Sequence, residues 1–180
     1  FCVSGTVCDA FSLGFVPLNI SSLTQGATRA INVTVNVSLG YPPGVYQGTI
    51  TSNTTGCSIA GHCTDNVTVN VTVPTTLTWL FTPSSYALNA TTDESGTIGD
   101  VRITNTGNAN ISLEITDSGS GSSLVSQSVS SLTVGNQSSA NFTITYNIPA
   151  STSPSFNTLY TVNFSITNTS STPLQRNVSV

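Results

Sequence analysis

Residues 66–73 read Asn-Val-Thr-Val-Asn-Val-Thr-Val, a strict alternation of polar and apolar side chains. Residues 31–39, Ile-Asn-Val-Thr-Val-Asn-Val-Ser-Leu, repeat the pattern. Because successive side chains of a strand point to opposite faces, the alternation predicts antiparallel strands with one buried face. These two segments therefore define the fold class as all-β.

The alternation extends to two later segments, 140–148 and 159–167. Further strands are expected around residues 77–81, 85–90, 97–105 and 110–116, and no stretch has a helical period of 3.6 residues. The inward side chains expected in the two later segments are Phe142, Ile144, Tyr146, Ile148, Tyr160, Val162, Phe164 and Ile166.

A repeat with an offset near 109 relates the two halves of the chain. Residues 46–55 resemble 160–169, and residues 66–69 match 177–180 at an offset of 111. The pairs that match at an offset of 109 are Leu23 with Leu132, Gly26 with Gly135, and Asn32 with Asn141.

The two copies are not equally complete. The second has four expected strands ahead of the shared part, whereas the first has little comparable material before Ser21. We therefore expect residues 1–73 to be a partial domain of later strands, and residues 74–180 to be a β-sandwich. Either the missing strands are encoded upstream in a longer tandem array, or a neighbouring subunit supplies them by strand addition.

An incomplete sandwich exposes an apolar face and unpaired strand edges, which favour association. The inward faces of the two alternating segments in the first copy are therefore the candidate assembly surface. Its residues are Ile31, Val33, Val35, Val37, Val67, Val69, Val71 and Val73.

Charge is scarce in this chain of 180 residues, because three Arg and seven acidic residues make up 6% of it. Without Lys, it cannot form the basic footprint that nucleic acid requires. A single histidine, His62, leaves few routes to acid–base catalysis, so we expect no enzyme and no cofactor. No apolar run approaches the 18 residues of a membrane span.

Four cysteines occur as two pairs with matching spacing, Cys2 and Cys8, then Cys57 and Cys63. An even count predicts disulfides and an extracellular location. Local pairing is the simplest connectivity, with Cys2–Cys63 and Cys8–Cys57 as the alternative. A zinc site of Cys57, His62 and Cys63 is the rival interpretation, although its spacing suits one ion poorly.

Asparagine within the N-x-S/T sequon provides a second indication of an extracellular location. An outward strand face built from Asn and Thr also generates such sequons, and either interpretation places the asparagines on the surface. We expect covalent N-glycans at several of thirteen sites: Asn19, Asn32, Asn36, Asn53, Asn66, Asn70, Asn89, Asn110, Asn136, Asn141, Asn163, Asn168 and Asn177.

Two weaker candidates remain. Asp93, Glu94 and Asp100 could surround Ca²⁺, but they lack regular ligand spacing, so an ordinary acidic loop is the better interpretation. Trp79 could stack on a sugar, although a lone Trp in an opening strand is more often a core residue.

Residues 44–50, Gly-Val-Tyr-Gln-Gly-Thr-Ile, followed by segment 66–73, resemble the final strands of immunoglobulin-like surface modules of bacterial and archaeal extracellular proteins. Residues 103–113, with Asn-Thr-Gly-Asn at the turn, are similar to an earlier strand–turn–strand of those modules. The resemblance covers most of residues 21–73 and 74–180. It implies tandem immunoglobulin-like β-sandwiches, the first incomplete, and implies a fold rather than an activity.

The low charge and dense sequons resemble archaeal cell-surface proteins, including S-layer and filament subunits that join through donated strands. We therefore expect a structural subunit of a glycosylated extracellular filament, pilus or surface layer, located at the cell surface. Its partners would be identical subunits in a homopolymer that assembles head to tail by β-strand complementation. The alternatives are a carbohydrate-binding or adhesin stalk module, and an appendage of a secreted hydrolase.

If the sequons carry glycans, the chain isolated from its native source will be heavier than the bare 18.6 kDa polypeptide. Intact-mass measurement before and after enzymatic deglycosylation checks this expectation. A native mass equal to that of the bare polypeptide would reject it.

Overall fold

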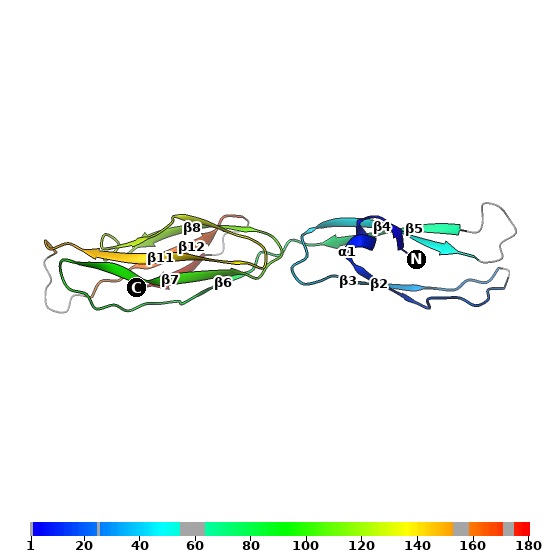
Figure 1. Ribbon diagram of the computed structural model, residues 1–180, viewed down its shortest axis with the longest axis horizontal. Coiled ribbons are helices and arrows are strands. Elements are labelled where there is room, and N and C mark those ends of the chain that lie inside the picture. The colour runs from blue at the N-terminus through cyan, green and yellow to red at the C-terminus, as the bar shows by residue number, and fades with distance from the viewer. Residues whose placement is uncertain (1, 25, 55–63, 153–158, 171–174) are drawn as a thin grey trace. The chain divides into compact units, whose positions relative to one another are not determined.

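The computed structural model describes residues 2–24, 26–54, 64–152, 159–170 and 175–180. Within them the fold is all-β, with antiparallel sheets and one short helix. The chain divides into two compact units, Phe1–Thr75 and Thr76–Val180, here called unit 1 and unit 2 (Figure 1). This division lies two residues beyond the one expected from the repeat.

Unit 2 contains two four-stranded sheets whose neighbouring strands are all antiparallel. The first has the order β6 (Trp79–Thr82), β7 (Glu94–Asn105), β11 (Ser139–Ile148), β9 (Val125–Gln127). The second has the order β10 (Ser131–Val134), β8 (Ile111–Ser118), β12 (Asn163–Asn168), β13 (Gln175–Ser179).

The two sheets of unit 2 share one apolar core. Alternate residues of β11 and β12 are buried, as the sequence pattern predicts, and β7 and β8 contribute in the same way. The largest fully buried side chains of this core are Phe142, Phe164, Ile103, Ile111, Leu113, Ile115, Ile144 and Ile166. Unit 2 is thus a two-layer β-sandwich.

Two expectations for unit 2 are wrong. Segment 85–90 forms no strand; instead Ser85 makes an isolated parallel bridge with Ser179. The strand expected from residue 159 begins at Asn163, and Tyr160, expected inward, is 38% exposed. In both places the backbone makes no continuous ladder with a neighbouring strand.

The turn between β7 and β8 is held by a buried asparagine, Asn105, which is 1% exposed. The two hydrogens of its Nδ2 atom are shared among the carbonyl oxygens of Ala109 (2.8 Å), Val134 (3.1 Å) and Gly135 (2.9 Å), so one of these bonds is bifurcated. Its Oδ1 atom accepts one from the Gly107 amide (2.9 Å). The side chain therefore ties the turn to the end of β10, while the Gly107 amide also donates to the Thr78 oxygen (3.0 Å).

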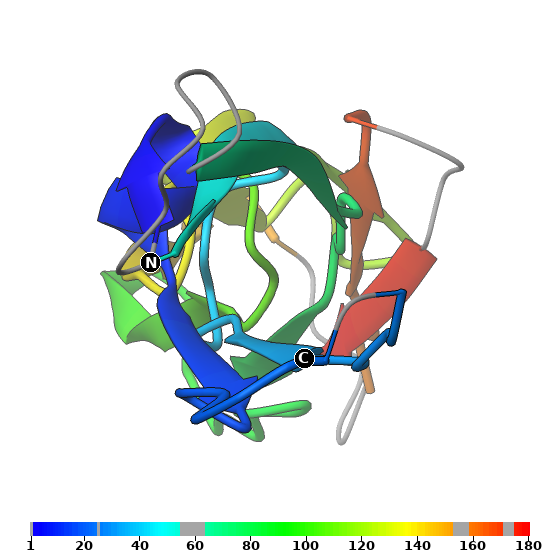
Figure 2. The same cartoon turned by 90° about the vertical axis from the view of Figure 1, so that its right-hand side faces the viewer.

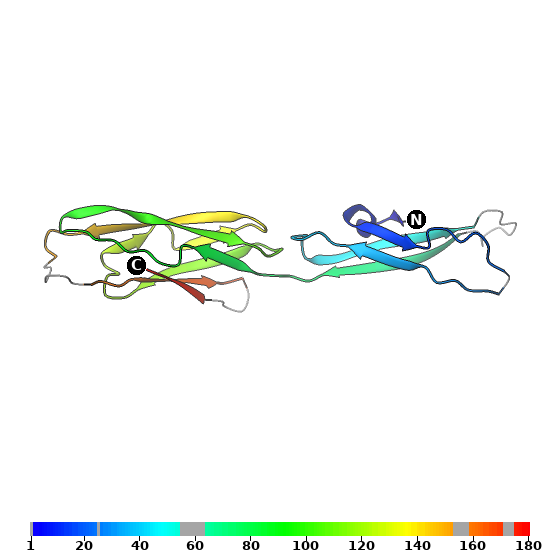
Figure 3. The same cartoon turned by 90° about the horizontal axis from the view of Figure 1, so that it is seen from below.

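Unit 1 also has two layers (Figures 2 and 3). One is the sheet β1 (Cys2–Ser4), β4 (Gly44–Asn53), β5 (Thr64–Val73), in that order. The other is the hairpin β2 (Ser12–Val16) and β3 (Asn32–Asn36), and helix α1 (Thr6–Ala10) lies between β1 and β2 in the chain.

A small core joins the layers of unit 1. Val7 and Phe11, from α1 and its C-cap, are buried with Val73 of β5. Phe11 also contacts the rings of Tyr41 and Tyr46, with centroids 4.8 Å and 5.1 Å away. The segment before Ser21, for which the sequence shows little material comparable to the opening of unit 2, forms β1, α1 and β2, and a five-residue helix is too short to show a helical period.

The two units share a strand register. Thr51 of β4 pairs with Asn66 of β5, and Ser165 of β12 pairs with Asn177 of β13. These are the residues that the sequence repeat aligns. The strand pairs β4–β5 and β12–β13 therefore occupy equivalent positions.

Replacement of Asn105 by Ala removes the side-chain partner of three carbonyl groups and one of the two acceptors of the Gly107 amide, which keeps its bond to the Thr78 oxygen. We expect Asn105→Ala to lower the free energy of unfolding of unit 2 by about 2–4 kcal/mol, because unsatisfied buried polar groups cost about 1–3 kcal/mol each. Urea denaturation of the full chain measures this.

The control is Asn89→Ala, at an exposed asparagine, which should change stability by less than about 0.5 kcal/mol. Equal effects of the two substitutions would contradict the role of Asn105.

Candidate assembly surface of unit 1

Within the described residues, β3 has a single neighbour, β2. Its counterpart in unit 2, β11, lies between two strands, β7 and β9. β3 is therefore an edge strand where β11 is a central one, and one of its edges has no ladder partner. Such an edge is a template for pairing with another chain.

Equivalent positions differ sharply in exposure between the units. Val33 aligns with Phe142, and the exposed fractions of their side chains are 40% and 1%. Val67 aligns with Val178, and their exposed fractions are 61% and 0%. Positions that form the core of unit 2 are thus at the surface in unit 1.

The eight predicted assembly residues separate into three groups: core, half-buried and exposed. Val73 is buried, and Val35 and Val71 pack against the cluster that it forms with Val7 and Phe11, so these three belong to the core of unit 1 rather than to an open surface. Val69 is half-buried. The exposed group comprises Ile31 at 43%, Val33 at 40%, Val37 at 37% and Val67 at 61%.

Exposed apolar side chains are concentrated in unit 1, although it is the smaller unit. Of the fifteen large hydrophobic side chains exposed in the described residues, ten belong to unit 1. The sequence did not predict four of these positions, which precede β3: Val16, Leu18, Ile20 and Leu23. Concentrated apolar exposure of this kind is typical of an interaction surface.

The sequon asparagines lie mainly on the opposite faces of the strands. Asn32 and Asn36 of β3, and Asn66 and Asn70 of β5, are exposed and alternate with the inward valines. Eleven of the thirteen sequon asparagines are exposed, and Asn136 is half-buried. Glycans on these outward faces would leave the inward apolar face accessible.

Asn168 does not fit the expectation of a surface position. It is 1% exposed, and its Oδ1 atom accepts a hydrogen bond from the Ser170 amide at 2.9 Å. This asparagine closes a turn after β12, much as Asn105 closes the turn after β7. A glycan at this position is incompatible with the folded sandwich.

The cysteines are described in part. Cys8 of α1 is disulfide-bonded, as predicted. Cys57 and Cys63, together with His62 and the zinc interpretation, lie outside the described residues. The described residues contain no group of three His, Cys, Asp or Glu side chains that could hold a metal ion.

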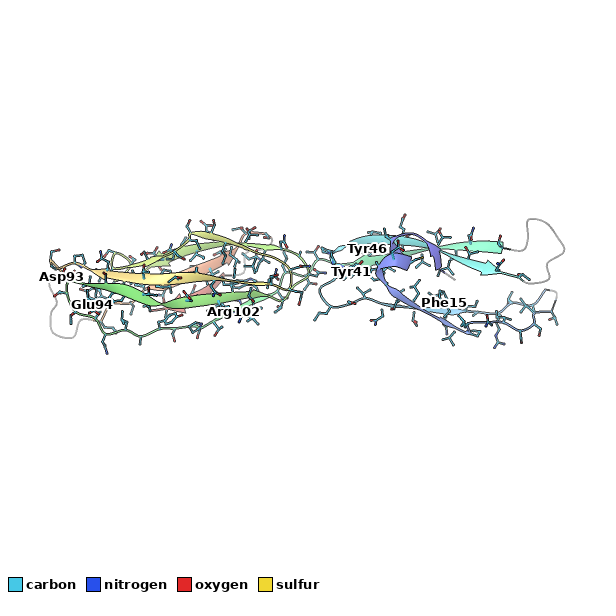
Figure 4. The ribbon with its side chains drawn as sticks, viewed as in Figure 1. Phe15, Tyr41, Tyr46, Asp93, Glu94 and Arg102 are labelled. Carbon is cyan, nitrogen blue, oxygen red and sulfur yellow. The ribbon has the colours of Figure 1, made fainter. Side chains whose placement is uncertain are left out.

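The carboxylates at the start of β7 are engaged within unit 2 (Figure 4). Glu94 Oε2 accepts a hydrogen bond from the Thr91 amide (2.8 Å), and its Oε1 accepts one from the Tyr146 hydroxyl (2.8 Å). Asp100 lies within β7 rather than in a loop, and its Oδ1 accepts a bond from Thr143 Oγ1. Each carboxylate therefore has its own hydrogen-bond donors, and the two do not form a shared cation site.

Two pKa values respond to this arrangement. The hydrogen bonds from the Thr91 amide, Tyr146 and the Thr91 hydroxyl lower the pKa of Glu94. The bond to Glu94, with burial and the carboxylate charge, raises the pKa of Tyr146. Both shifts favour the state in which Glu94 is ionised and Tyr146 is protonated.

Trp79 is a core residue, as the sequence indicates, with an exposed fraction of 3% and the Arg176 guanidinium 5.1 Å from its ring centre. It offers no exposed platform for a sugar. A shallow groove does occur on the outside of β8 and β10, but its lining contains no aromatic residue: Ser112, Leu113, Glu114, Ile115, Thr116, Ser130, Ser131, Leu132, Thr133 and Thr169.

No protein-family model matches this chain, and a search of curated proteins finds no relative. In the described residues, no helix has the length and apolar character needed to cross a membrane.

The lowered pKa of Glu94 predicts a contribution to stability that is present above its unfolded-state pKa and is lost as the pH falls through its folded-state pKa. Glu94→Gln should therefore flatten the acid limb of stability against pH. Urea denaturation between pH 7 and pH 3 measures the limb, with exposed Asp117→Asn as the control. An unchanged acid limb in Glu94→Gln would contradict the assignment.

Proposed function

We propose that this protein is a structural subunit of a glycosylated extracellular filament, pilus or surface layer, and that identical subunits join by β-strand complementation. The homopolymer forms head to tail, with unit 1 of each subunit receiving β-structure from its neighbour. The subunit performs no catalysis and uses no cofactor in this role.

One observation carries the proposal: the strand positions that are core in unit 2 are exposed in unit 1. A side chain such as Val33 occupies an inward position on a strand that still has a free edge. One added strand would both cover that apolar face and pair with that edge. Because a strand offers both backbone hydrogen bonds and alternate apolar side chains, it is the natural complement.

The strand order of unit 2 supports the immunoglobulin-like interpretation. Constant-type immunoglobulin sheets have the orders A-B-E-D and C-F-G. Taking β6, β7, β8, β9, β11, β12 and β13 as strands A to G reproduces both orders, with β10 as an additional strand beside β8. On this basis unit 1 has counterparts of the later strands, whereas β6 and β7 have none among its described residues.

The cell-surface location rests on chemistry that is independent of the strand argument. Disulfide bonding of Cys8 favours an oxidising compartment. Exposed sequon asparagines on the outward faces of β3 and β5 provide glycan sites that avoid the proposed interface. The composition, with its low charge and resemblance to archaeal surface proteins, is consistent with such an environment.

The carbohydrate-binding or adhesin alternative has less support. Trp79, the side chain considered for stacking on a sugar, is buried, and the groove on β8 and β10 lacks aromatic side chains. We therefore retain assembly as the proposed function.

The proposal predicts that a charge on the inward face prevents association. In the full chain, Val33→Asp and Val67→Asp should each weaken self-association about tenfold or more, because burying an unpaired carboxylate is costly. Sedimentation velocity over a range of protein concentrations measures the association. Since Val33 and Val67 are exposed in the isolated subunit, the fold should survive, which far-UV circular dichroism checks.

The matched control is Asn32→Asp, which adds the same charge to the outward face of β3. It should associate like the unmodified chain. If Val33→Asp and Asn32→Asp associate equally well, the inward face is not the interface.

A further inference from the structure

We propose that the outer edges of β5 and β13 are protected against strand pairing by a charged side chain at the same inward position of each strand, Asp65 in β5 and Arg176 in β13. This inference rests on the proposed function and deepens it, because it explains why association would use the β2–β3 hairpin rather than these two edges. A second feature, which caps one backbone position of each edge, supports the charge.

Both strands lie at the end of their sheets, β5 beside β4 and β13 beside β12. Val162 and Val180 exchange both backbone hydrogen bonds, at 2.9 Å and 2.8 Å. Because antiparallel pairs alternate between bonded and non-bonded, Asn177 and Ser179 direct their backbone groups away from β12. Asn66, which aligns with Asn177, does the same on β5. These groups form the outer edge of each sheet.

The two charged side chains occupy inward positions of these edge strands. Side chains two residues apart share a strand face, so Arg176 shares the face of Val178, and Asp65 shares that of Val67. Val178 is fully buried in the core of unit 2, and Val67 aligns with it. The ladders that contain these residues have no register shift. Both charges therefore lie on the face that the rest of the strand uses for apolar residues.

The two positions are equivalent in the repeat. Asn66 matches Asn177 at an offset of 111, so Asp65 aligns with Arg176. Charged residues make up only 6% of the chain, so two of them at one aligned inward position are not expected from composition. Their signs are opposite, so the feature that the two copies share is charge itself. An inward-pointing charge is one way in which natural proteins protect a sheet edge.

The charge acts against an added strand because both groups are solvated in the free subunit. Asp65 and Arg176 are exposed, and the Arg176 guanidinium also lies 5.1 Å from the ring centre of Trp79. A strand added to either edge would place its own inward side chains beside the charge and exclude water from it. Because burying an unpaired charge is costly, the joined state is disfavoured.

The second feature caps one backbone position of each outer edge. On β5 the Asn66 amide donates to the Asp65 Oδ1 atom at 2.9 Å. On β13 the Ser179 amide donates to the Ser84 oxygen at 3.2 Å, and the Ser179 oxygen accepts a bond from the Tyr86 amide at 2.9 Å. Backbone groups that an added strand would need are therefore already bonded within each unit.

The segment that caps β13 is anchored to the other sheet of unit 2. The Tyr86 hydroxyl donates to the Asp100 oxygen of β7 at 2.6 Å. Its ring occupies the space beside Gly99, where a Cβ atom would lie 2.5 Å from it. The glycine therefore allows the tyrosine to hold residues 84–86 against the end of β13.

The β2–β3 hairpin lacks such a charge. Segment 31–39 contains no charged residue, and its inward positions are aliphatic. The remaining edge strands, β1, β6, β9 and β10, are only three or four residues long, which itself protects an edge. Among the described strands, the hairpin is thus left available, which directs association to unit 1.

Sedimentation velocity of full-chain variants tests the device in a Val33→Asp parent, in which association through the inward face of β3 is blocked. Adding Asp65→Val or Arg176→Val should strengthen self-association about tenfold or more over this parent, because the edge then offers an apolar side chain in place of a charge. Far-UV circular dichroism checks that each variant is folded.

The matched controls are Glu114→Val and Arg102→Val, which remove outward charges from strands that have neighbours on both edges. They should associate no more than the parent. If Asp65→Val and Arg176→Val also associate no more than the parent, the inference is overturned. A parent that associates as strongly as the unmodified chain contradicts the proposed function instead, while the gain over that parent still decides the inference.

Charge reversal separates charge from the particular side chain. In the same parent, Asp65→Arg and Arg176→Glu should associate no more than the parent, because either sign opposes burial. Reversed variants that gain as much association as the valine variants would overturn the role of charge.

Amide hydrogen exchange of the associated valine variants locates the new contact. Association should slow exchange about 100-fold or more at Thr68 in the Asp65→Val variant and at Asn177 in the Arg176→Val variant, because these outer-edge amides gain partners. Exchange that is unchanged at these amides would show that the new contact is not strand pairing at the β5 or β13 edge, and would contradict the inference.

Discussion

An unpaired strand edge beside an uncovered apolar face favours association, and within the described residues β3 has both. Val7 of helix α1 and Phe11 at its end pack with Val73, so the apolar face around Val73 is covered by residues of unit 1 itself. The positions of Ile31, Val33 and Val67 stay exposed because no described element reaches them.

Unit 2 is a finished version of the same strand set. There β7 pairs along the full length of β11 and places Val101 and Ile103 in a core that contains Phe142. Full burial of a Val or Ile side chain contributes about 1.5–3 kcal/mol, so covering the half-exposed side chains of unit 1 yields several kcal/mol. Association costs about 4–15 kcal/mol, so the partner strand must add its own apolar residues and edge hydrogen bonds.

The sequence predicted the strands whose inward faces are regular. Alternation identified β5, β11 and the buried positions of β12, and the repeat anticipated the shared register of Thr51–Asn66 and Ser165–Asn177. It failed where structure depends on contacts distant in the chain. Helix α1 is too short for periodicity, and segment 85–90, which was expected to form a strand, makes only one bridge, at Ser85.

The sequence predicted which strand faces carry the candidate assembly surface, but it did not predict which residues of those faces are exposed. Alternation alone treats Val71 and Val33 as equals, because both are inward valines on regular strands. They differ because Val71 packs against the buried cluster that contains Phe11, whereas Val33 lies outside that cluster and is 40% exposed. Asn168 shows the same limit, since its sequon reads like the other twelve while its side chain is buried in a turn.

Negative-stain electron microscopy of the full chain, imaged over increasing protein concentration, tests the central claim most directly. The account predicts regular filaments or sheets with a repeat set by one subunit. Single particles of one chain at every concentration would contradict it.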